Sequence, residues 1–140
     1  MERLTYVMMG LEALYLAESS ELSHRLAQRV AKIMGFLGFN SQEVYKEIKE
    51  AYGIRSKFIH GASFKEKEIY RAGDLVDKII RYLQISILTF LELGHAANKG
   101  KQEILELLDA SMISPALQEE LEDMISKSCQ VTLMVSRQKA

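Results

Sequence analysis

The sequence predicts an all-α fold: a single-domain bundle of five to six helices around one long central helix. Apolar residues recur three and four positions apart through most of the chain, which is the period of an amphipathic helix. There is one proline, and most of the eight glycines fall near the expected helix ends. At 140 residues the chain has the length of one domain, and an ordinary hydrophobic core suffices to fold it.

The first two helices are predicted at about 2–18 and 21–37, where apolar residues follow the helical period. Ser20 is expected to cap the second helix, because a serine oxygen accepts hydrogen bonds from the free N–H groups of a first turn. The segment Gly-Phe-Asn-Ser at 38–41 is predicted to be a turn. We expect its last residue, Ser41, to cap the helix that follows.

The third helix is predicted at about 42–59. Gly53 lies inside it, where a glycine costs up to about 1 kcal/mol relative to alanine. It therefore marks either a kink or close packing against a neighbouring helix. Gly61 is expected to adopt the left-handed backbone conformation that often ends a helix.

Three further helices are expected at about 66–94, 101–110 and 115–126. The segment Ile79–Leu93 is apolar on most sides, which predicts that this helix is the centre of the bundle. Pro115 suits the first helical position, where its missing N–H would have no partner in any case. Residues 129–135 alternate between apolar and polar as a strand does, although a frayed helix fits equally well. We divide the chain into a core at about 4–95, a helical extension at about 100–126 and a tail at 127–140.

The composition indicates a protein of a reducing compartment, and we expect it in the cytoplasm. Cys129 is the only cysteine, so no internal disulfide can form. The most apolar stretch, Ile85–Leu91, is far shorter than the roughly 18 residues that span a bilayer. Residues 4–17 are apolar enough for a signal segment, but Glu12 interrupts them and a basic leader is lacking. No membrane partner is therefore expected.

Arg55 and His60 are the residues that point most directly to chemistry, because both fall in the last turns of the third predicted helix. Arginine is a permanent planar cation that can hydrogen-bond two phosphate oxygens. Histidine can accept or donate a proton near neutral pH. Such a pair could cleave RNA through its own 2′-hydroxyl, without a metal or another cofactor. The alternative is that both residues only bond the last carbonyl groups of the helix.

The spacing of this pair constrains its geometry. Five residues turn a helix by about 500°, so Arg55 and His60 lie about 140° apart on a regular helix. They cannot both face one phosphate unless the last turn is distorted or a second chain contributes. A symmetric homodimer would bring two copies of each residue to a shared cleft.

Basic residues around the pair are the candidate contacts to RNA. Residues 46–81 carry nine Lys/Arg against six Asp/Glu, a balance of +3, although the whole chain has a net charge of −1. A local positive field attracts phosphate even on a near-neutral protein. The candidates are Lys57, Lys65, Lys67 and Arg71, with a solvated surface as the alternative. Four aromatic residues interleave with the basic ones and could stack on bases or pack in the core: Tyr45, Tyr52, Phe58 and Phe64.

Three segments together resemble the Apea-like branch of the HEPN superfamily. They are LEAL at 11–14, SELSHRLAxRVA at 20–31 and YxxRSKxIHG at 52–61. The arginine–histidine element alone is common, and its combination with the upstream pattern is more specific. The resemblance covers roughly residues 4–95, which is most of the chain.

This resemblance implies an α-helical bundle that dimerises across the motif-bearing helices. Many HEPN proteins are metal-independent endoribonucleases that act as toxins, in phage defence or in RNA processing, some of them with an antitoxin partner. In them the motif arginine and histidine are the catalytic pair, here Arg55 and His60, and the polar residue after the arginine, here Ser56, assists. The resemblance thus predicts cleavage of single-stranded or loop RNA. A non-catalytic dimeric module that binds RNA or protein is the alternative.

This chain departs from the family pattern at two positions. Ser56 stands where asparagine is frequent. Ala62 stands where the branch that is paired with a nucleotidyltransferase antitoxin has a tyrosine. The second departure removes the ground for tyrosine-directed silencing and leaves the expectation of RNA cleavage unchanged.

Other polar residues are assigned to structure. No two histidines have the spacing of metal ligands and Cys129 is alone, so we expect no metal site. Glu12 lies on an otherwise apolar helix, where an unpaired buried carboxylate would be costly. We expect it at an exposed edge of that helix. The alternative is a salt bridge to Arg55 or to another cation.

Overall fold

The described part of the chain folds into six helices, which confirms the predicted all-α bundle. The computed structural model describes residues 1–18 and 20–127. The helices are α1 (Glu2–Tyr15), α2 (Leu22–Phe36), α3 (Ser41–Ile59), α4 (Glu66–Ala96), α5 (Lys101–Ser111) and α6 (Pro115–Ser126). Apart from residue 127, the predicted tail lies outside the described residues, and so does the alternation at 129–135.

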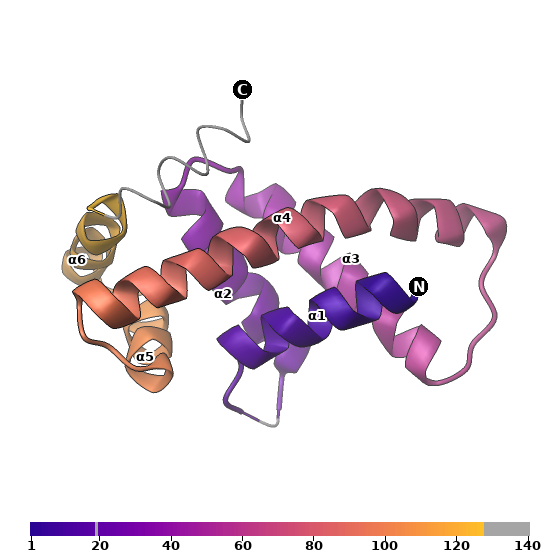
Figure 1. Ribbon diagram of the computed structural model, residues 1–140, viewed down its shortest axis with the longest axis horizontal. Helices are drawn as coiled ribbons and strands as arrows, with labels where there is room; N and C mark the ends of the chain where they lie inside the picture. Colours follow the sequence, from indigo (N-terminus) through magenta and orange to yellow (C-terminus); the bar gives the residue numbers. More distant parts are fainter. Residues whose placement is uncertain (19, 128–140) are drawn as a thin grey trace.

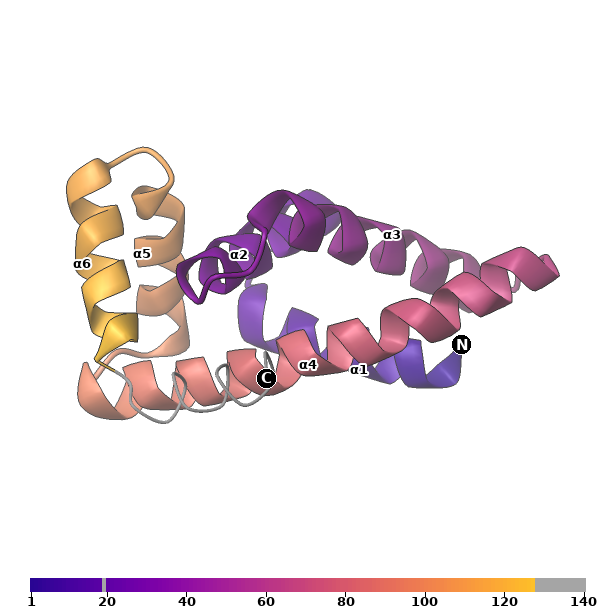
Figure 2. The same cartoon turned by 90° about the horizontal axis from the view of Figure 1, so that it is seen from above.

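The helices form two layers with a pair of helices across one end (Figures 1 and 2). The helices α2 and α3 pack against each other in one layer, and α1 lies along α4 in the other. The α5–α6 pair packs at the end of α4 that is farther from the N-terminus. The longest helix is α4, with 31 residues and a length of about 46 Å, as predicted for the central helix.

One continuous hydrophobic cluster joins both layers and the α5–α6 pair. It contains the predicted stripe of α1, with Leu4, Met8, Leu11 and Tyr15 all buried. The Tyr15 hydroxyl donates a hydrogen bond of 2.7 Å to Ser86 Oγ on α4. Fully burying one such apolar side chain contributes about 1.5–3 kcal/mol, so this stripe is a large part of what holds α1 on α4.

Three apolar residues of the third and fourth predicted helices lie at the surface. Ile59, at the end of α3, is 54% exposed. Ile87 and Leu91 are exposed on α4, although Ile79–Leu93 was predicted to be covered on most sides. The reason is geometric, because no helix of the described residues covers the outer face of α4 there (Figure 2).

The helix caps differ from the prediction at two turns. Asn40 caps α3, since its side-chain oxygen accepts from the Glu43 N–H at 3.1 Å, and Ser41 is already the first helical residue. Asparagine and serine cap equally well, so their order in the sequence could not decide between them. Ser20 does not cap α2: the residue before that helix is Glu21, in the left-handed conformation with φ 54°, and its side chain makes no capping bond.

Gly53 is not a site of close packing. A methyl group added to it would meet no atom within 4 Å, and the position is exposed on α3. The packing of the fold therefore gives no reason for a glycine there.

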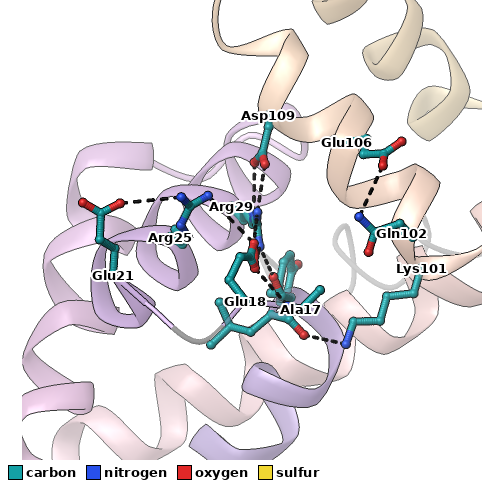
Figure 3. Close-up of polar contacts among 11 residues, drawn as sticks. Ala17, Glu18, Glu21, Arg25, Arg29, Lys101, Gln102, Glu106 and Asp109 are labelled. Atoms are coloured by element: carbon teal, nitrogen blue, oxygen red, sulfur yellow. Dashed lines mark hydrogen bonds and ion pairs between the residues drawn. The ribbon is translucent and has the colours of Figure 1, made fainter.

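A buried arginine joins α2 to two other parts of the bundle (Figure 3). Arg29 is 3% exposed. Its guanidinium donates to both oxygens of Asp109 on α5 at 2.9 and 2.8 Å, and to the carbonyl oxygen of Tyr15 at 2.6 Å. It also pairs with Glu18, just after α1. Because five acceptor oxygens surround it, the buried charge is compensated.

The Arg29–Glu18 pair makes stability depend on pH. The hydrogen bond from Arg29 holds the pKa of Glu18 at about 2 in the folded protein, below the usual value of 4.5. A depressed carboxyl pKa stabilises the fold fully above the unfolded value, and this contribution is lost as pH falls from about 4.5 to about 2. We expect denaturant titrations at stepwise pH to show this loss, and Glu18→Gln to be less sensitive to pH over the same window. If the free energy of unfolding fell equally with pH in the wild-type and Glu18→Gln proteins, the assignment would be contradicted.

Candidate functional site

Arg55 lies on the side of α3 that faces α1 and makes an ion pair there. Its Nη1 lies 2.8 Å from Oε1 of Glu12, and the two side chains are only 18% and 21% exposed. The expectation that Glu12 occupies an exposed edge was therefore wrong, and the alternative of a salt bridge to Arg55 is correct. The stripe of α1 alone could not show this, because the partner lies 43 positions further along the chain.

The Glu12–Arg55 pair is incompletely satisfied. Glu12 Oε1 and Arg55 Nε are both buried and have no partner with hydrogen-bond geometry among the described residues. Burial raises the pKa of Glu12, and the charge of Arg55 opposes that rise. Arg55 thus has donor capacity left over, and Glu12 holds its negative charge at a cost. An anion that reached this place would compete with Glu12 for the guanidinium.

His60 is held at the end of α3 by a well-formed helix stop. The N–H of Gly61 donates to Phe58 O at 3.1 Å, and the N–H of Ala62 donates to Lys57 O at 3.0 Å. With φ of 73° at Gly61, these bonds form a Schellman motif, which confirms the predicted left-handed end. His60 is the residue just before that glycine, and it is exposed. Its imidazole therefore sits on a fixed backbone with access to solvent.

One chain does not bring the two motif side chains together. Arg55 points to α1, while His60 lies at the exposed helix end, in agreement with the separation of about 140° that the helix period requires. In the described part of the chain, no hydrogen bond or ion pair links them. Ser56 is half-buried, and its carbonyl oxygen accepts from the His60 N–H at 3.1 Å. Ser56 therefore contacts the histidine only through the backbone of the last turn.

Two of the four candidate RNA contacts are neutralised by carboxylates. Lys57 Nζ lies 2.6 Å from Glu68 Oε1. Arg71 donates to both oxygens of Glu50 at 2.8 Å, which lowers the pKa of Glu50. The sequence did not reveal these pairs because they join α3 to α4. Lys65 and Lys67 are exposed at the start of α4.

The four aromatic candidates form two pairs with different surroundings. Tyr45 and Tyr52 are half-buried and pack against the core. The Tyr45 hydroxyl also lies 3.0 Å from His24 Nδ1. The rings of Phe58 and Phe64 lie 6.5 Å apart, and Lys57 stands 5.2 Å from the centre of the Phe64 ring.

Neither a metal centre nor a membrane span is found in the part of the chain that the structure covers. Among residues 1–18 and 20–127, no group of three or more His, Cys, Asp or Glu side chains could hold a metal ion. Over the same residues, no helix is both long and apolar enough to cross a membrane.

Comparisons with protein-family models, with curated proteins and with solved structures found no match to this chain. The resemblance to the HEPN superfamily therefore remains a prediction from three sequence segments.

The ion pair between Glu12 and Arg55 can be measured by a double-mutant cycle. We expect Glu12→Gln and Arg55→Gln to be coupled by about 1 kcal/mol in the free energy of unfolding, because both side chains are mostly buried. The pair Glu50–Arg71, which is 40% and 42% exposed, is the matched control and should show weaker coupling because solvent screens it. Chemical denaturation of the four proteins of each cycle gives the comparison. Equal coupling in the two cycles would contradict a special environment at Glu12.

Proposed function

We propose that this protein is a metal-independent endoribonuclease that cleaves single-stranded or loop RNA at the Arg55–His60 site. The observation that carries the proposal is the state of Arg55, a mostly buried cation with an unsatisfied donor, placed five residues before an exposed histidine at the end of α3. A structural arginine at a helix end would bond the last carbonyl groups. Among the described residues Arg55 forms no such bond, and it faces instead the mostly buried carboxylate of Glu12.

The reaction needs only acid–base chemistry and charge stabilisation. The 2′-oxygen of one nucleotide attacks the adjacent phosphorus, and the bond from phosphorus to the 5′-oxygen of the next nucleotide breaks. The 2′-hydroxyl loses a proton and the departing 5′-oxygen gains one, so one base and one acid are required. The products are a 2′,3′-cyclic phosphate and a free 5′-hydroxyl.

Each proposed residue has a defined task in this reaction. His60 acts as the base or the acid. Arg55 binds the phosphate oxygens and stabilises the charge that builds up on them. Ser56 helps to hold the last turn that orients His60. Glu12 keeps Arg55 in place while the site is empty and gives it up to the phosphate, a release that its raised pKa favours.

A homodimer supplies what a single chain lacks. Two copies of His60 in a shared cleft can serve as base and acid, and the Arg55 of one copy can reach a phosphate that the His60 of the other contacts. Large apolar side chains are exposed on the helices that meet near His60, namely Tyr6 and Met9 on α1, Ile59 on α3, and Ile69 and Tyr70 on α4. Such side chains are typical of a surface that another protein covers.

A non-catalytic module that binds RNA or protein is the second candidate. It is favoured by the neutralisation of Arg55 by Glu12 within one chain. A toxin or defence role and an antitoxin partner are compatible with both candidate functions, since they follow from the family resemblance alone.

Cleavage of a fluorescent single-stranded RNA in EDTA tests the proposal. We expect the wild-type protein to produce fragments with 2′,3′-cyclic phosphate ends. His60→Ala should cut at least about 100-fold more slowly, which is the usual contribution of a general acid or base. The matched control is His95→Ala, which removes another exposed histidine from the last turn of α4 and should cleave like the wild type.

Other outcomes separate the candidates. Binding of RNA without cleavage by any of the three proteins would support the non-catalytic module. Cleavage by His60→Ala at the wild-type rate would exclude His60 from the reaction. Activity that EDTA abolishes would contradict a metal-independent mechanism.

A further inference from the structure

The exposed side of α3 forms a stripe that leads to His60. Gln42, Lys46, Lys49, Gly53, Ser56 and His60 follow one another at intervals of three or four residues. At 100° per residue, they lie within about 40° of one line along the helix. All of them are exposed except Ser56, which is half-buried. From Lys46 to His60 this stripe, the α3 stripe, spans about 21 Å.

The cations of the α3 stripe differ from most others near the site because no carboxylate neutralises them. Arg55, Lys57 and Arg71 are each paired with a glutamate. Lys46 and Lys49 make no ion pair with any described residue, and Lys49 Nζ only stands 5.8 Å from the centre of the Tyr45 ring. Their positive charge is therefore available to an external anion.

The carboxylates of the same helix lie beside the stripe, and two of them are engaged by α4. Glu43, Glu47 and Glu50 lie about 80–140° around α3 from the line of the stripe. Glu47 accepts from Lys78 at 3.0 Å and from the Tyr82 hydroxyl at 2.8 Å, and Glu50 pairs with Arg71. The stripe itself thus carries positive side chains only, and Glu47 and Glu50 beside it are engaged by residues of α4.

A groove opens at the end of the stripe that is farther from His60. It has a volume of about 540 Å³, and Gln42, Tyr45 and Lys46 of α3 line it together with Gln28 and Lys32 of α2. No carboxylate lines this groove. Lys32 donates to the side-chain oxygen of Gln118 at 2.8 Å, a neutral partner that leaves its charge uncompensated.

Gly53 lies at the middle of the stripe and leaves the helix backbone bare. A side chain would fit there without a clash, and almost any other residue would favour the helix more. The missing side chain is explained if another molecule approaches the backbone at this point. Tyr45 and Tyr52, one turn of α3 on either side of Lys49, flank the same stretch as half-buried aromatic side chains.

We propose that the α3 stripe is the track of a single-stranded RNA, which runs from the groove at Lys46 past Gly53 to His60. Lys32, Lys46 and Lys49 contact its phosphates, and Gly53 lets the strand pass close to the helix. This proposal rests on the proposed function for the cleavage at the His60 end, while the binding itself is independent of cleavage. The phosphate contacts in this proposal are cations that pair with no carboxylate, and they take the place of Lys57 and Arg71.

Salt-dependent binding of a short fluorescein-labelled 2′-O-methyl RNA tests the track, because this RNA has no 2′-hydroxyl to cleave. Each lysine–phosphate contact to a single strand contributes about 0.7 to the slope of log K against log salt. We expect Lys46→Gln/Lys49→Gln to lower the slope by about 1.4 and to weaken binding at least tenfold in low salt. Arg3→Gln/Arg81→Gln removes the same charge from exposed positions on α1 and α4 and should leave the slope unchanged.

Substitution of two exposed glycines inside helices, Gly53 and Gly73, provides a second test that does not depend on charge. Gly53→Gln should weaken RNA binding about tenfold while the melting temperature stays the same or rises. Gly73→Gln changes another exposed helical glycine with no atom near its added carbon and should bind RNA like the wild type. Equal binding by both glycine variants would overturn the close approach at Gly53.

The outcomes distinguish this proposal from the nuclease assignment. If the wild type cleaves ordinary RNA but Lys46→Gln/Lys49→Gln binds as tightly as the control, the track is wrong and the nuclease stands. If the stripe binds RNA and no RNA is cleaved, the track stands without the nuclease. Absence of RNA binding by the wild type, or stronger binding of an acidic protein than of RNA, would overturn the track.

Discussion

The buried guanidinium of Arg29 is the interaction on which the arrangement of the helices depends. A charge that is 3% exposed is tolerable only with partners in good geometry, and those partners come from three places: the end of α1, residue Glu18 and helix α5. Arg29 therefore fixes α2 relative to both the N-terminal helix and the C-terminal pair. Because α3 packs on α2, the position of α3 follows from the same contact.

The function that we propose is organised around α3, whose sides face four different surroundings. Apolar residues such as Val44 and Ile48 enter the core, and Arg55 extends this inner side toward α1. Glutamates face α4 and meet its basic residues. The half-buried tyrosines lie on the side nearer α2, where Tyr45 meets His24. The exposed side keeps Lys46, Lys49 and His60. One regular helix thus holds an anchored arginine, an accessible histidine and an unpaired basic surface at fixed positions.

Periodicity predicted the helices well, because each helix contributes its own apolar stripe to the core. The end of α3 at Gly61 was predicted from a local rule, because a glycine that follows a helix readily adopts the left-handed conformation. Contacts between distant segments could not be derived in this way. The pairing of Glu12 with Arg55, and the neutralisation of Lys57 and Arg71, depend on which helices become neighbours. The exposure of Ile87 and Leu91 had the same cause, since an apolar run does not reveal which of its sides a neighbour covers. Lys46 and Lys49 were part of the basic region, yet only the structure separates them from the neutralised cations.

The central claim is that Arg55 and His60 complete one active site only when two copies of the chain meet. A mixing experiment tests it most directly: Arg55→Ala and His60→Ala proteins, each inactive alone, are unfolded together in denaturant, refolded as a mixture and assayed for RNA cleavage in EDTA. Our account predicts that the mixture regains measurable activity below that of the wild type, because a mixed dimer joins the intact arginine of one chain to the intact histidine of the other but lacks the second histidine. A mixture that forms dimers and stays as inactive as its two parents would contradict the claim.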